Sequence, residues 1–145
     1  MLGFVFMALL GTAETEILLK LALSLALGML IGLEREIHKK PAGMRTHTLV
    51  CVGATLFAVM SVSFVEDPAR IAAGVVTGIG FLGAGMILQA KDKIIGLTTA
   101  AELWALAAIG LAVGMGSYFA AIAAAFAVLL VLWPGKMLEK NLRKR

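Results

Sequence analysis

The sequence has little of what most catalytic and metal sites are made from. Its 145 residues include one cysteine, two histidines and three prolines, and only 15% of them are charged. One cysteine, Cys51, excludes an internal disulfide and a thiolate cluster within one chain, and its apolar neighbours favour a buried structural role. Neither His38 nor His47 has a second ligand at metal spacing, so we expect no zinc site. No serine, histidine and acid constellation indicates a hydrolase, and we do not expect an enzyme.

Hydrophobic residues are what the chain has in excess. They make up 61% of the sequence, and the mean hydropathy is +0.97, far above that of a soluble domain. A membrane-spanning helix needs about 20 apolar residues. The sequence therefore predicts an all-α, polytopic membrane helix bundle of about five spans. We place them at Ile17–Leu33, His47–Val65, Ala69–Ala90, Thr98–Met115 and Tyr118–Pro134.

The basic residues predict how this bundle is oriented. Eleven of the 13 Lys and Arg residues lie between spans one and two, between spans three and four, or after span five. Since cytoplasmic segments are enriched in Lys and Arg, the N-terminus is expected outside and the C-terminus in the cytoplasm. Residues 1–16 would be an extracytoplasmic segment, 17–134 the membrane domain and 135–145 a basic tail. No positive region precedes the first apolar stretch, so we expect no cleaved signal peptide. The pattern does not indicate nucleic-acid binding.

One glycine-rich segment resembles a dinucleotide-binding loop. Gly78, Gly80 and Gly83 have the G-x-G-x-x-G spacing, but such a loop must follow a strand and open a soluble helix. Here the glycines lie inside an apolar run, where small residues instead allow helices to approach closely. The chain also has three glycine pairs at i, i+4 spacing. We interpret all of these as helix-packing residues and expect a homo-oligomer, a dimer in the simplest case; the set is Gly28, Gly32, Gly74, Gly78, Gly80, Gly83, Gly85, Gly110 and Gly114.

Local signals predict where several spans begin and end. Asp67-Pro68 places an N-cap acceptor before a proline at the first helical position. Thr99 and Glu102 have the T-x-x-E spacing of a capping box at the start of span four. Glu102 has an alternative role, facing a polar cavity inside the bundle. Pro134-Gly135 is predicted to end span five.

Charged residues at helix ends are the candidates for function. Glu34, Arg35 and Glu36 end span one directly, and Arg45 opens span two. Two readings stay open: a solvated loop with salt bridges, or a buried ion-pair network with a hard-oxygen site for Mg²⁺, which prefers one or two carboxylates plus waters. Asp67 and Arg70 either cap and pair at the outer end of span three or flank an outer vestibule. His38 is expected to be exposed and His47 to be structural.

Several motifs together resemble the MgtC/SapB family of membrane proteins. They are Gly32-Leu33-Glu34-Arg35-Glu36, Pro41-Ala42-Gly43-Met44-Arg45-Thr46-His47-Thr48-Leu49-Val50, Asp67-Pro68-Ala69-Arg70, Gly78-Ile79-Gly80-Phe81-Leu82-Gly83-Ala84-Gly85 and Gly96-Leu97-Thr98-Thr99-Ala100-Ala101, from about Glu16 to Leu132. The resemblance implies a bacterial inner-membrane protein of about five spans, associated with magnesium homeostasis. One family member is described as restraining ATP synthase. We expect the soluble C-terminal domain of longer relatives to be absent.

The resemblance also makes particular residues stronger candidates for a functional role. Those in matching motifs are Glu34, Arg35, Arg45, Asp67, Arg70, Thr98 and Thr99. Two functions remain open. In the first, the protein binds or conducts Mg²⁺, with Glu34 and Asp67 as candidate ligands and no other cofactor. In the second, it is a non-transporting regulator whose glycine grooves dock another membrane complex, with ATP synthase as the candidate that the resemblance implies.

Overall fold

The computed structural model describes residues 11–63, 67–90 and 93–142. Five helices account for most of it: α2 (Thr12–Ile37), α3 (Met44–Ser63), α4 (Pro68–Met86), α5 (Leu97–Gly114) and α6 (Tyr118–Leu142). Two short strands, β1 (Leu88–Ala90) and β2 (Lys93–Ile95), form an antiparallel hairpin between α4 and α5. Residues 1–10, Val65 at the expected end of span two, Lys91 and tail residues 143–145 lie outside the described residues.

The predicted all-α bundle is confirmed. Helices α2, α3, α4 and α5 are each long and apolar enough to cross a membrane, and the apolar part of α6, Tyr118–Trp133, is shorter. Large apolar side chains are exposed along the helices, for example Phe81, Phe119 and Val131. In water such a surface would drive aggregation, whereas in a bilayer it faces lipid. The chain is therefore a multi-pass membrane protein.

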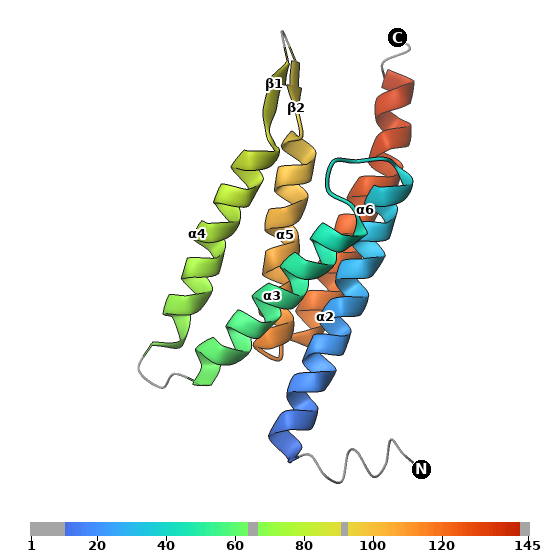
Figure 1. Ribbon diagram of the computed structural model, residues 1–145. Coiled ribbons are helices and arrows are strands. Elements are labelled where there is room, and N and C mark those ends of the chain that lie inside the picture. The colour runs from blue at the N-terminus through green and yellow to red at the C-terminus, as the bar shows by residue number, and fades with distance from the viewer. Residues whose placement is uncertain (1–10, 64–66, 91–92, 143–145) are drawn as a thin grey trace.

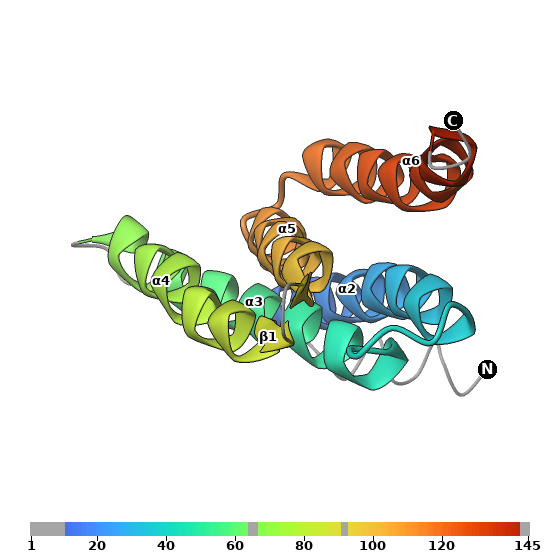
Figure 2. The same cartoon turned by 90° about the horizontal axis from the view of Figure 1, so that it is seen from above.

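Helix α5 is the centre of the bundle. It contacts each of the other four helices, and it contributes more buried residues than α2 or α3, among them Leu103, Leu106 and Ile109. Helices α2, α3 and α5 pack mutually, while α4 and α6 lie on opposite sides of α5 (Figure 2). The bundle thus has a three-helix core and two flanking helices.

The connections divide the bundle into two ends. The α2–α3 loop, the hairpin, the start of α5 and the far end of α6 lie together at one end (Figure 1). The start of α2, the end of α3, the start of α4 and the α5–α6 turn lie at the other end. The basic loop residues Lys39, Lys40 and Lys93 therefore share one end, as the charge count predicts. We call it the basic end; that it faces the cytoplasm stays a prediction.

Two predicted helix ends and one predicted cap differ from the structure. The span placed at Ala69–Ala90 is too long, because α4 ends at Met86 and the hairpin follows. Gly96 joins the second strand to α5 with a φ of 89°, and a Cβ there would lie 1.9 Å from the Met86 carbonyl oxygen, so this position requires glycine. Pro134-Gly135 does not end the last helix, which continues to Leu142. Pro68 does open α4, but its N-cap Asp67 makes no side-chain capping bond.

Candidate functional site

A buried ion-pair network joins three helices at the basic end. Its centre is Arg35, in the last turn of α2, with a side chain only 2% exposed. Nη1 of Arg35 donates to Oε1 of Glu102 on α5 across 2.8 Å. Nε and Nη2 of the same guanidinium contact Oε2 of Glu34. An unpaired charge inside a membrane bundle costs about 2.5–3.5 kcal/mol or more, so this network ties α2 to α5.

His47 extends the network to α3. Its side chain is fully buried, and Nε2 lies 3.7 Å from Oε2 of Glu102. Nδ1 lies 3.0 Å from the carbonyl oxygen of Gly43, one turn earlier. Neither Nε2 of His47 nor Oε2 of Glu102 has a hydrogen-bond partner. We call Glu34, Arg35, His47 and Glu102 the buried cluster.

His38 lies at the rim of the buried cluster. It caps the C-terminus of α2 and is about one-third exposed, with Nδ1 2.8 Å from the carbonyl oxygen of Glu34. The same nitrogen is 2.8 Å from Oε1 of Glu34, but that contact lacks hydrogen-bond geometry, and Oε1 of Glu34 has no hydrogen-bond partner. The expectation that His38 is simply exposed is therefore wrong.

The structure decides between the two readings of Glu102. The predicted capping box with Thr99 is wrong, because α5 already begins at Leu97 with Gly96 as its N-cap, and no side chain caps it. Thr99 and Glu102 then lie within the first turns, both buried. The carboxylate points into the bundle and pairs with Arg35. The alternative of a polar interior position is the one realised.

Glu36 has a different task from its neighbours. Its Oε2 accepts a hydrogen bond of 2.8 Å from the backbone N–H of Met44, the first residue of α3. A carboxylate is favourable at a helix N-terminus, where backbone N–H groups lack partners. A Cβ on Gly43 would approach Oε2 of Glu36 to 2.9 Å, so glycine leaves room for this cap. Glu36 thus orients the α2–α3 loop outside the buried cluster.

The remaining charged candidates do not join the buried cluster. Asp67 and Arg70 are exposed at the start of α4, at the opposite end of the bundle (Figure 1). Arg45 and Thr98 are exposed at the basic end. Glu34 and Asp67, the candidate Mg²⁺ ligands, therefore cannot share one ion. Among the described residues no three His, Cys, Asp or Glu side chains are grouped to hold a metal ion.

The predicted glycine pairs fall into two groups. A Cβ on Gly28 or Gly32 would approach the α3 backbone to 2.9 or 2.6 Å, and one on Gly110 or Gly114 would come within 2.4 Å of α3 atoms. These four glycines allow close helix packing, as predicted. Gly83 makes only ordinary contact, with Ala100. On α4 a Cβ would meet no atom within 4 Å at Gly74, Gly78, Gly80 or Gly85.

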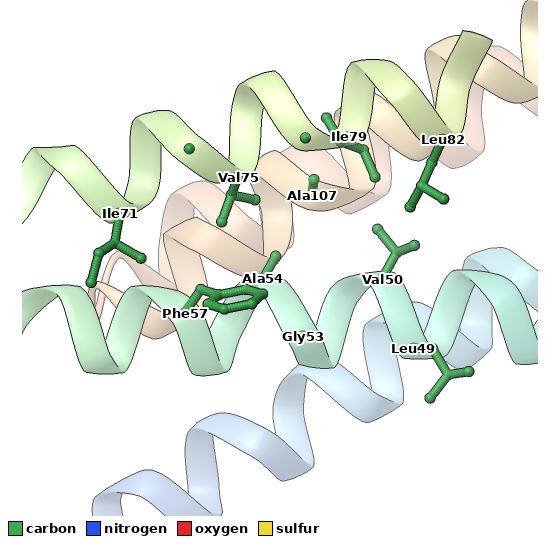
Figure 3. A pocket seen from close by; sticks show the side chains of 12 residues that line it. Leu49, Val50, Gly53, Ala54, Phe57, Ile71, Val75, Ile79, Leu82 and Ala107 are labelled. Atoms are coloured by element: carbon green, nitrogen blue, oxygen red, sulfur yellow. The ribbon is translucent and has the colours of Figure 1, made fainter. Parts of the chain in front are cut away.

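Two of these open glycines line an apolar groove between α3 and α4. It has a volume of about 650 Å³, and Gly74 and Gly78 lie on its wall. Figure 3 shows Ile71 and Val75 projecting from α4 toward Phe57 and Ala54 on α3. The groove carries no charged side chain. It suits an apolar occupant such as a lipid chain or a helix.

The comparisons with known proteins agree with this architecture. Residues 21–141 match the MgtC family model, a range that contains every member of the buried cluster. The chain belongs to the MgtC family. No solved structure matches it.

Three curated relatives illustrate this MgtC family membership. The chain is 47% identical to YhiD of Escherichia coli (strain K12) over 83% of its own length and 60% of that protein. It is 36% identical to SapB of Bacillus subtilis (strain 168), over 91% of its own length and 66% of SapB. It is 45% identical to MgtC of Salmonella typhimurium (strain LT2), over 77% of its own length and 49% of that protein. The chain thus spans about half to two thirds of these relatives.

Sequence reasoning identified three members of the buried cluster and missed the fourth. The sequence predicts only a structural role for His47, although it contains one further signal. His47, Cys51, Ala54 and Ala58 recur at the spacing of one helix face and are all buried. A histidine that continues a face of small residues faces the helices packed there. Which partner it meets depends on the position of α5.

Proposed function

We propose that this chain is a membrane protein of magnesium homeostasis that acts without conducting Mg²⁺ through its own helix bundle. One relative, YhiD, carries a name that describes it as a candidate magnesium transporter, and this supports the link to magnesium. The proposed location is the bacterial inner membrane, with the basic end in the cytoplasm. We propose no enzymatic activity and no resident cofactor.

One observation favours a non-conducting role: a guanidinium already occupies the space between the buried carboxylates. Arg35 contacts both Glu34 and Glu102 and is itself 2% exposed. A divalent cation entering this space would meet the positive charge of Arg35. Removing water from Mg²⁺ is expensive, and Mg²⁺ sites usually retain several waters. The buried cluster therefore supports a structural tie better than an ion path.

The core beyond the buried cluster argues in the same direction. Beyond the cluster, the three helices share one buried apolar core, to which α2 contributes Leu27 and Ile31, α3 contributes Cys51, and α5 contributes Leu106, Ile109 and Val113. The buried hydroxyl of Thr55 donates to the carbonyl oxygen of Gly110, so it is already engaged. Selective pores are lined by carbonyl rings or charged rings. The described interior provides neither.

Flux measurements on purified protein in liposomes test this proposal. We expect Mg²⁺ uptake no greater than in empty vesicles, with a Mg²⁺ ionophore as the positive control for the dye. Uptake above that background that is lost in Glu34→Gln and in Asp67→Asn would overturn the non-conducting role. The magnesium link is tested separately by deleting the gene in its host. Unchanged growth and cellular Mg²⁺ at low external magnesium would contradict that part.

We propose further that regulation works by docking a transmembrane helix of a partner protein on α4. The support is the open groove beside Gly74 and Gly78, where a partner helix could approach the α4 backbone. ATP synthase is the candidate partner that the family resemblance implies, and a second copy of this chain is the competing occupant.

Two glycines on α4 provide a matched pair for the test. Neither Gly78 nor Gly80 has an atom within 4 Å of an added Cβ, but only Gly78 lines the groove. Gly78→Leu should abolish co-purification of the partner, whereas Gly80→Leu should retain it. If both variants keep the partner, or both lose it while still inserting, the groove is not the docking site. Crosslinking between copies that depends on Gly78 alone would identify a homo-oligomer instead.

A further inference from the structure

Two buried polar atoms of the buried cluster face each other without a partner. Nε2 of His47 lies 3.7 Å from Oε2 of Glu102, and neither makes a hydrogen bond. Their side chains are 0% and 4% exposed, so water does not solvate them freely. A buried polar atom without a partner is destabilising, because it has given up its hydrogen bonds to water and gained none in return. Each of the two atoms therefore lacks the hydrogen-bond partner that its burial requires.

The other ring nitrogen fixes the chemistry of this contact. Nδ1 of His47 lies 3.0 Å from the carbonyl oxygen of Gly43. A carbonyl oxygen only accepts, so Nδ1 must carry a hydrogen. In a neutral imidazole Nε2 is then a lone pair. That lone pair would point at an oxygen of an ionised carboxylate, and two acceptors repel.

The formal charges around the pair also favour the addition of one positive charge. Glu34 and Glu102 are two carboxylates and Arg35 is one guanidinium, which leaves a formal charge of −1 if the histidines are neutral. His38 lies at the rim, about one-third exposed. The α6 side chains that line a pocket together with Glu34 and His38 are all apolar. On α4 the one charged residue, Arg70, lies in the first turn, at the other end of the bundle.

We propose that the buried cluster binds one proton, carried either by Nε2 of His47 or by Oε2 of Glu102, because the 3.7 Å between these atoms is too long for a proton shared in one hydrogen bond. The proton converts two facing acceptors into a donor and an acceptor and cancels the remaining negative charge. It also links α3 to α5 directly, beside the link from α2 to α5 through Arg35. A metal ion is a poorer occupant, since the described residues group no three suitable ligands. The site is thus a proton-binding site built across three helices.

Nuclear magnetic resonance of ¹⁵N-histidine tests the proposal on the full chain in lipid nanodiscs. The sequence has only two histidines, and His38→Gln leaves His47 as the single labelled ring. At neutral pH we expect both ring nitrogens of His47 to show N–H-type resonances. A lone-pair resonance at Nε2 is also consistent if infrared spectra show a protonated carboxyl band that Glu102→Gln removes. A lone-pair Nε2 without that band overturns the proposal.

A variant and a metal control sharpen the result. In Glu102→Gln, added to the His38→Gln background, the Nε2 resonance should move to the lone-pair region, because an amide can donate to it. The spectra are recorded with EDTA and again with added Mg²⁺ or Zn²⁺. A His47 Nε2 resonance that changes with EDTA in the His38→Gln protein would show that a metal ion, and not a proton, occupies the site. Because the spectrum of the His38→Gln protein is decisive by itself, a misfolded Glu102→Gln variant does not remove the test. The outcome is independent of Mg²⁺ flux and partner docking.

Discussion

The same glycine motif has opposite surroundings on α5 and on α4. Gly110 and Gly114 lie against α3, where an added Cβ would fall within 2.4 Å of backbone or Cβ atoms. Gly74 and Gly78 have the same spacing, yet an added Cβ would meet nothing within 4 Å. Helix α5 is mostly buried within the bundle, whereas only 17% of the apolar, membrane-spanning part of α4 is buried.

The difference shows what a small-residue motif provides. Glycines flatten a helix face, but the approach of a neighbour depends on what else holds the two helices together. Helix α5 is held by Glu102, through Arg35 on α2, and by the bond from Thr55 to Gly110. Among the residues that the structure describes, α4 contributes no charged group to the buried cluster. Three tests, in order of decreasing effect, challenge this account.

Replacing Arg35 should have the largest effect. Arg35→Met leaves Glu34 and Glu102 buried without their cation, and breaking a buried pair by removing one partner costs about 3–5 kcal/mol. The measurement is the free energy of unfolding by SDS in mixed micelles. Arg70→Met, at the exposed start of α4, is the control and should change stability by less than about 0.5 kcal/mol. If the two substitutions lowered the free energy of unfolding equally, the buried cluster would not stabilise the bundle more than an exposed charge does.

Alanine at the two kinds of glycine should give effects of opposite sign. At Gly114 the new Cβ would lie 2.4 Å from Cβ of Ala58 and 2.5 Å from the carbonyl oxygen of Thr55. We expect Gly114→Ala to cost about 1–3 kcal/mol through overpacking. Gly74→Ala meets open space, and alanine favours the helix by about 0.5–1 kcal/mol. Thermal unfolding in detergent measures both. A loss of stability in Gly74→Ala would mean that α4 packs more closely than the structure shows.

The smallest effect concerns a single hydroxyl. Thr55→Val removes the 2.9 Å bond to the carbonyl oxygen of Gly110, and such bonds between membrane helices contribute about 0.6 kcal/mol on average. Thr77→Val is the matched control, since Thr77 bonds the carbonyl of Ala73 within its own helix and is exposed. The same unfolding assay compares them. If both variants were neutral, the bond would not help to hold α3 against α5.

Much of the fold was predictable because lipid imposes simple rules. Apolar length and the placement of Lys and Arg predicted the helices and the two ends of the bundle, and Pro68 marked the start of α4. The hairpin was missed because Ile87 and Leu88 are as apolar as the rest of the predicted span, Ala69–Ala90. Gly96 marks the end of the hairpin, but the need for glycine there comes from its close approach to the carbonyl oxygen of Met86, which only the structure reveals.

The candidate site was less predictable. Glu34 and Arg35 were expected to matter because charges at a span end are costly. The T-x-x-E spacing supported two roles for Glu102, and local sequence could not choose between them. The choice depended on whether Arg35, far away in sequence, lies opposite Glu102. His47 was missed for the same reason.

The sequence by itself determined a basic-ended, multi-pass helical membrane protein of the MgtC family, because hydropathy, charge placement and motif order are properties of the chain alone. Only the tertiary structure decided which glycines are contacts and which carboxylates are paired. Those outcomes depend on distances between helices, which local sequence does not encode. A buried charge is stable only beside its partner, and a glycine is a contact only beside another backbone. The packing of α2, α3 and α5 supplies both.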